Sequence, residues 1–86
     1  MLDNIKKALR ITHSELDSEI QELIEVAQAD LKSVGVIFDE NKPMRRQAVS
    51  FYCQANFGKD NPSFEKYTVA YERLKTILVM GVDDDE

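Results

Sequence analysis

The sequence of 86 residues contains only one cysteine, Cys53. A single thiol cannot form a disulfide within the chain, and it excludes zinc sites built from several cysteines. A chain of this length buries only about 60–65% of the surface that its unfolded form exposes, so its stability is marginal without such crosslinks. We therefore expect association with other protein chains to supply additional stability.

Long apolar runs are also missing. The N-terminal stretch MLDNIKKALR has no apolar core of the kind found in signal peptides. No other segment approaches the length needed to cross a bilayer. We expect a soluble protein without a membrane partner, and its lone thiol is compatible with a reducing compartment.

Positive charge is scarce as well. The chain has 16 acidic and 11 basic residues, and its formal net charge is −5. The terminal DDDE (83–86) holds four of the acids, so the remainder carries 12 acidic and 11 basic residues, a balance of −1. A nearly neutral body argues against strong sequence-independent binding to nucleic acids. We predict one domain over residues 1–81, followed by a disordered acidic tail at 82–86.

What the sequence does contain is a helical pattern of apolar residues over most of its length, and no convincing strand. The pattern predicts four helices, over residues 2–10, 15–34, 42–57 and 62–80. Gly35 marks the end of the second and longest helix. The predicted fold is therefore all-α: a small bundle of four helices with one long central helix.

The stretch ITHSELDSEIQELIEV places the only histidine, His13, among several carboxylates. A metal or acid–base site is one interpretation, but a helical metal pair requires ligands at positions i and i+4 on one face, and this histidine lies at or before the helix start. Ser14 followed by Asp17 fits a capping box. Thr12 followed by Glu15 is a competing box, which leaves a less ordinary loop after the preceding helix. We predict a helix start here, with no metal or cofactor.

No nucleophile and base form a recognised motif such as G-x-S-x-G. The stretch FGKDNPSFEKY has a single glycine, too few for a phosphate-binding loop, and instead predicts a helix stop, a turn and a helix start capped by Asn61. The tyrosines follow helical spacing, which favours core or interface positions over base stacking. We predict that the protein has no catalytic residues and is not an enzyme.

The third predicted helix carries apolar residues on two sides. Val49, Cys53 and Phe57 recur at i, i+4 and i+8, opposite the main apolar stripe. Such a helix is either sandwiched within its own fold or presents one side to a partner. Because a chain of 86 residues has little protein to cover both sides, we predict that these three residues belong to a subunit interface.

Charged residues supply the second candidate for an interface. One flank of the second helix, the acidic flank, carries Glu15, Glu19, Glu22, Glu25 and Asp30. Arg45 and Arg46 lie at the start of the third helix, where the helix dipole disfavours cations. Two solvated faces are the simple explanation. The alternative is that the acidic flank of one subunit meets Arg45 and Arg46 of a neighbour, which predicts association that weakens with salt.

The order of residues along the chain gives information beyond composition and periodicity. Three stretches follow one another: LDNIKKALRITHSELDSEIQELIEVAQADLKSVG, NKPMRRQAVSFYCQANFG and YTVAYERLKTIL. They contain Leu9-Arg10-Ile11, Asp17 with Ile20 and Ile24, Ala27, Pro43 with Ala48, Tyr52-x-x-Ala55-Asn56-Phe57-Gly58 and Tyr71-x-x-Leu74. In this order and spacing, over about residues 2–78, the chain resembles the tailed-phage head–tail connector family, whose members are also described as DNA-packaging proteins.

The resemblance implies an all-α virion protein that forms a ring below the capsid portal and extends the DNA channel. Its implied partners are further copies of itself, the portal protein, a tail-joining protein and passing DNA that is not bound sequence-specifically. It implies a place at the head–tail junction, and in the host cytoplasm during assembly. A ring needs two different patches that meet head to tail. We expect the back of the third helix and the acidic flank to supply them.

A small phage-encoded helical DNA-binding regulator is the alternative function. It would require a helix-turn-helix with a basic recognition helix. The third helix offers Arg45 and Arg46 but otherwise little positive charge. The sequence therefore favours the connector.

Overall fold

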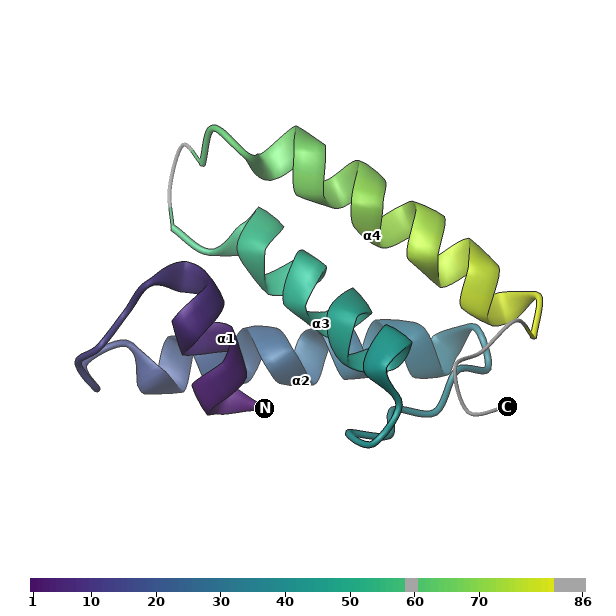
Figure 1. Cartoon of the computed structure of the whole chain (residues 1–86), viewed down its shortest axis with the longest axis horizontal. Helices are drawn as coiled ribbons and strands as arrows, with labels where there is room; N and C mark the ends of the chain where they lie inside the picture. The colour runs from purple at the N-terminus through teal and green to yellow at the C-terminus, as the bar shows by residue number, and fades with distance from the viewer. Residues whose placement is uncertain (59–60, 82–86) are drawn as a thin grey trace.

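A computed structural model of the chain describes residues 1–58 and 61–81. These residues form four α-helices and no strand: α1 (Leu2–Leu9), α2 (Asp17–Ser33), α3 (Pro43–Asn56) and α4 (Phe64–Val79) (Figure 1). The predicted all-α class is confirmed. In this part of the chain, no helix has the length and apolar character needed to span a membrane. The predicted tail at 82–86 lies outside the described residues.

The helix at the centre of the fold is α3. The other three helices each pack against it, and α1 also packs against α2 (Figure 1). α2 is the longest helix, with 17 residues, but α4 has 16 and α3 has 14. The prediction of one long central helix is therefore not confirmed, because the longest helix lies to one side of a shorter central one.

α3 is sandwiched between α4 on one side and α1 with α2 on the other. Phe51 of α3 meets Tyr67 of α4, with ring centroids 6.0 Å apart. Val49 and Cys53 are each two residues from Phe51, which places them about 160° around the helix from it. Both are completely buried, in one core with residues of α1 and α2 such as Ile5 and Ile24.

The prediction that Val49, Cys53 and Phe57 form an apolar face in need of a partner is therefore wrong for Val49 and Cys53. Phe57 is partly buried and also packs against the core. The side of α3 that carries Val49 and Cys53 is covered by α2 and by α1. Helix α1 has only eight residues, but its Ile5 is completely buried. The spacing of apolar residues shows that a helix has two apolar sides, but it does not show which segments cover them.

The start of α2 differs from the predicted capping boxes. Its N-cap residue is Leu16, and no side chain caps the helix. His13 Nδ1 accepts a hydrogen bond from the backbone N–H of Glu15, at 3.4 Å. Asp17 pairs with Lys6 of α1, with 2.8 Å between Oδ1 and Nζ. The acidic residue assigned to the cap thus ties α1 to α2 instead.

The end of α2 follows the prediction. Gly35 adopts the left-handed conformation, with φ of +89°, and the N–H of Val36 bonds to the carbonyl of Leu31 at 2.9 Å. This arrangement is a Schellman motif, which satisfies carbonyls left open at the helix end. It turns Val36 into the core, at 4% exposure, while the next residue, Ile37, is 58% exposed.

The turn between α3 and α4 is tied by Asn61, which is not the cap of α4 that the sequence suggested; Ser63 holds that position. Asn61 Nδ2 donates to the carbonyl oxygens of Gln54 and Phe57, at 2.7 and 3.2 Å. Its Oδ1 accepts a hydrogen bond from the N–H of Ser63 at 2.8 Å. One side chain therefore satisfies open carbonyls at the end of α3 and positions the start of α4.

The burial of α3 predicts an unreactive thiol. Burial raises the pKa of Cys53 to about 12, and the side chain is fully covered. We expect a chromogenic disulfide reagent at pH 8 to label Cys53 in the native protein only at the rate of unfolding, and at once in denaturant. In the control variant Ala8→Cys, which adds a thiol at an exposed position of α1, one thiol per chain reacts immediately. Immediate labelling of Cys53 in the native chain would show that α3 is not covered on this side.

Candidate subunit interface

Four residues of the acidic flank lie on the outer side of the molecule. Glu15, Glu19, Glu22 and Glu25 are exposed, whereas the buried residues of α2 occupy the opposite face. Glu25 accepts a hydrogen bond from Gln21, at 3.4 Å. Within residues 1–58 and 61–81, the other three carboxylates make no hydrogen bond or ion pair. This part of the acidic flank keeps its charge available for solvent or a partner.

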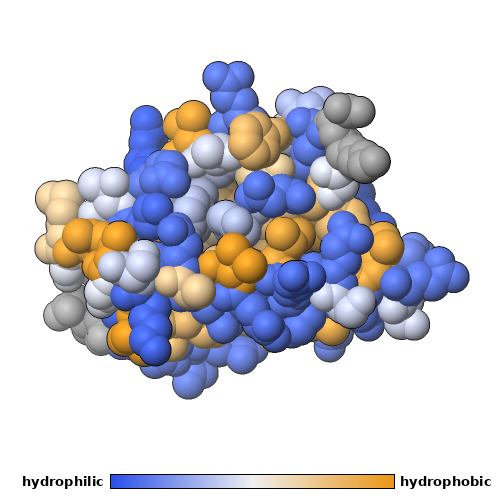
Figure 2. All heavy atoms as spheres, turned by 180° about the vertical axis from the view of Figure 1, so that it is seen from behind, coloured by the Kyte–Doolittle hydropathy of each residue, from blue (hydrophilic) through white to orange (hydrophobic). Residues whose placement is uncertain are grey.

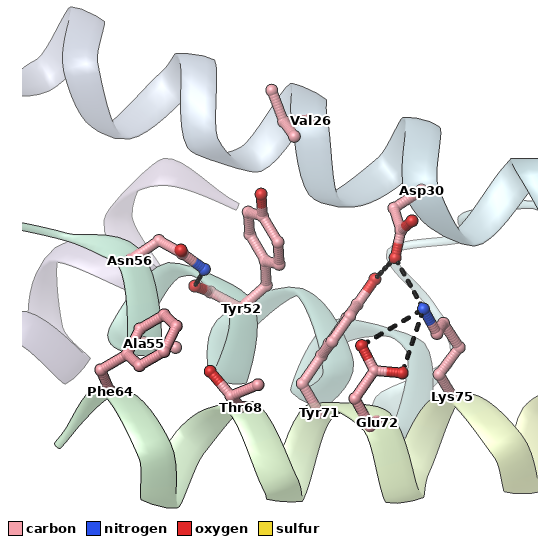
Figure 3. A pocket seen from close by; sticks show the side chains of 10 residues that line it. All are labelled: Val26, Asp30, Tyr52, Ala55, Asn56, Phe64, Thr68, Tyr71, Glu72 and Lys75. Carbon is pink, nitrogen blue, oxygen red and sulfur yellow. Dashed lines mark hydrogen bonds and ion pairs between the residues drawn. The ribbon is translucent and has the colours of Figure 1, made fainter.

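Asp30, the fifth member of the acidic flank, turns toward α4 instead. Its carboxylate accepts hydrogen bonds from the hydroxyl of Tyr71 and from Lys75 Nζ, the latter at 3.0 Å (Figure 3). Lys75 also pairs with Glu72, one turn earlier on α4, at 3.3 Å. This Asp30 network joins α2 directly to α4 alongside the central helix.

The Asp30 network shifts the pKa values of its members. The hydrogen bond from Tyr71 and the nearby Lys75 ammonium lower the pKa of Asp30, although burial acts in the opposite direction. Burial and the hydrogen bond to Asp30 raise the pKa of Tyr71. Burial favours a lower pKa for Lys75, but its hydrogen bonds to Asp30 and Glu72 outweigh that and raise it. All three of these shifts favour the ordinary ionisation state of Asp30, Tyr71 and Lys75 at neutral pH, as expected for a structural network.

A groove of about 270 Å³ lies beside this network, between α2, α3 and α4 (Figure 3). Its lining includes the apolar residues Val26 and Phe64, which are 45% and 49% exposed. The ring of Tyr52, which also lines the groove, meets that of Tyr71 edge-on, with centroids 5.3 Å apart. Seen from behind, the molecule shows small hydrophobic areas separated by hydrophilic side chains (Figure 2). In the described part of the chain, no group of three or more His, Cys, Asp or Glu residues is placed to hold a metal ion.

Arg45 and Arg46, the predicted counterparts of the acidic flank, hold the loop that precedes α3. Arg45 Nη1 donates a hydrogen bond to the carbonyl oxygen of Ile37. Arg46 Nη1 donates to the carbonyl oxygen of Glu40 at 2.8 Å. These bonds to loop carbonyls explain why two cations stand at a helix N-terminus, where the dipole alone disfavours them. A contact between these arginines and a neighbouring subunit stays a prediction.

The Asp30 network was not predicted from the sequence. Helical spacing assigns the tyrosines, including Tyr71, to core or interface positions, and Asp30 to the acidic flank. A partial signal exists, because Tyr71 and Lys75 are four residues apart and therefore share one helix face. Their common partner lies 41 and 45 residues away, so recognising it requires knowing that α2 and α4 lie side by side.

Comparison with known proteins adds one finding. A family model described as phage connector protein matches residues 1–85, a range that includes all four helices. Searches of curated proteins and of solved structures gave no match.

Replacing Asp30 tests the role of the Asp30 network in stability. Asp30→Asn can still accept a hydrogen bond from Tyr71 but removes the charge that faces Lys75. We expect a loss of about 1 kcal/mol in the free energy of unfolding at pH 7, a small value because Asp30 is partly exposed and solvent screens the pair. Urea denaturation measures this loss.

The pH dependence of the same difference follows from the lowered pKa of Asp30. The stability advantage of the natural chain over Asp30→Asn is complete at pH values well above 3.8, the ordinary pKa of the side chain. It disappears as the pH falls through the lower pKa of the folded state. Glu22→Gln, which removes an equal charge from an exposed residue, is the matched control and should cause no loss. Equal stability of the two variants at pH 7 would contradict a stabilising network.

Proposed function

This chain belongs to the phage connector protein family, and from that premise we propose that it is a ring-forming subunit at the head–tail junction of the virion. In this role, copies of the chain assemble below the capsid portal, extend the DNA channel and dock tail-completion proteins. The family match over residues 1–85 is the observation that carries the proposal. We place the protein in the virion, and in the host cytoplasm during assembly.

The charge distribution supports a role in assembly. A ring requires two different patches on each subunit, which meet head to tail. Glu15, Glu19 and Glu22 are exposed, and their carboxylates have no hydrogen-bond or ion-pair partner among the described residues. Such a surface suits a neighbour that carries positive charge, and it disfavours close contact with the phosphates of passing DNA. The role needs no chemistry of its own, so we propose a structural protein rather than an enzyme.

The alternative, a DNA-binding regulator, gains no support from α3. A recognition helix presents its basic side chains to the major groove. Arg45 and Arg46 instead donate hydrogen bonds to the carbonyl oxygens of Ile37 and Glu40. The guanidinium groups that suggested a DNA-reading helix are thus engaged by the chain's own loop.

Co-purification with the portal protein of the same phage tests the connector role. We expect the full chain to co-purify with tagged portal protein and to lose that association as salt rises, because charged surfaces contribute to assembly. Imaging of particles should place a ring of the chain between portal and tail. Particles made without the chain serve as the control and should lack that ring.

Binding to duplex DNA distinguishes the alternative. We expect a dissociation constant of about 100 micromolar or weaker at physiological salt, which is at or below the weak end of non-specific DNA binding. Tight binding with a steep salt dependence, combined with no association with the portal, would overturn the connector role and favour the regulator.

A further inference from the structure

An apolar hollow of about 230 Å³ opens along the contact between α3 and α4, on the side away from the Asp30 network. We call it the α3–α4 hollow. Its lining consists of Phe51, Ala70, Arg73, Leu74 and Ile77. Four of these are apolar and partly buried, and Arg73 is exposed. Arg73 makes no hydrogen bond or ion pair with another residue that the structure describes. The hollow thus combines an apolar floor with one positive charge that no residue described by the structure compensates.

Another part of the chain presents a side chain that suits this hollow. The loop after α2 turns Val36 inward, and Ile37 projects outward with 58% of its surface exposed. The hydrogen bond from Arg45 to the carbonyl oxygen of Ile37 holds this backbone against the start of α3. An apolar side chain on a fixed backbone loses little conformational freedom when it binds. Ile37 is therefore a preformed apolar protrusion.

A carboxylate lies beside this protrusion. Glu25, a member of the acidic flank, lines the same hollow on α2 as Ile37, together with Phe38 and the exposed Lys32. Of the two charged groups beside Ile37, the Glu25 carboxylate is the one that can pair with the guanidinium beside the α3–α4 hollow. The hollow between α3 and α4 is also large enough, since it exceeds the roughly 150 Å³ of an apolar cavity that accepts a benzene molecule.

We propose that Ile37 of one subunit inserts into the α3–α4 hollow of a second copy of this chain, where Glu25 pairs with Arg73. The inference rests on the proposed ring and names the surfaces that form it. These surfaces share no residue, so the contact is head to tail, the type from which rings are built. Arg73 takes the place that the sequence suggested for Arg45 and Arg46, whose guanidiniums hold the loop.

Disulfide trapping between two full-length variants tests this contact. Ile37→Cys and Ala70→Cys are purified separately, mixed and oxidised, with Cys53 buried and giving no background. Head-to-tail contact predicts heterodimers in the mixture and only background dimers with either variant alone. A mixture of Ile37→Cys with Ala8→Cys, an exposed position of α1, is the control. We expect about tenfold more heterodimer than in the control, and equal yields would overturn the proposal.

Charge reversal tests the pair of Glu25 and Arg73. Adding Arg73→Glu to the Ala70→Cys chain should lower the heterodimer yield by up to about fivefold, the range of an exposed ion pair. Adding Glu25→Arg to the Ile37→Cys chain should restore the yield, because the opposite charges then face each other again. Failure of the second reversal to restore the yield would overturn the assignment of this pair. Far-ultraviolet circular dichroism confirms that each variant keeps its helices.

The outcomes separate this contact from the connector role. If imaging places the chain in a ring at the head–tail junction while trapping yields no excess heterodimer, the ring uses other surfaces and the contact is wrong. If heterodimers form in excess but the chain neither binds the portal nor occupies the junction, the contact stands and the connector role fails.

Discussion

The fold depends on covering one helix, α3, from both sides. An 86-residue chain has little material for this purpose, and an exposed second apolar side would favour association. The eight residues of α1 and one face of α2 cover the side that carries Val49 and Cys53, while α4 covers the side of Phe51. The central helix, α3, is shorter than α2, and α2, the longest helix, forms part of its cover.

Polar contacts position the covering helices. Lys6 and Asp17 join α1 to α2, Asn61 joins the end of α3 to the start of α4, and Asp30 joins α2 to α4 through Tyr71 and Lys75. Apolar burial is not directional, so it favours contact without specifying how helices are aligned. Hydrogen bonds and ion pairs at fixed positions supply that alignment. They also use charges that the sequence had suggested for capping or for an interface.

Because the fold itself covers both sides of α3, surfaces for partners have to lie on the outside of the molecule. The exposed features include most of the acidic flank, Ile37, and Arg73 beside the partly buried apolar residues of the α3–α4 hollow. In the proposed ring, the subunit interfaces are built from residues that the fold of one subunit does not use. Arg45 contributes both to the fold and to the proposed interface. Its hydrogen bond to the carbonyl oxygen of Ile37 stabilises the loop and also fixes the position of Ile37.

From the amino-acid sequence alone we could predict the all-α class, the approximate extent of four helices, the stop at Gly35 and the family. These follow from spacing, turn residues and residue order, which act locally or can be compared directly along the chain, and the match to the phage connector family confirmed the resemblance. Three features required knowledge of the tertiary structure: Val49 and Cys53 are core residues, Asp30 pairs with Lys75, and the arginines at the start of α3 hold a loop. Each of these depends on which elements lie side by side, and helical periodicity gives the faces of a helix without naming the neighbour that each face meets.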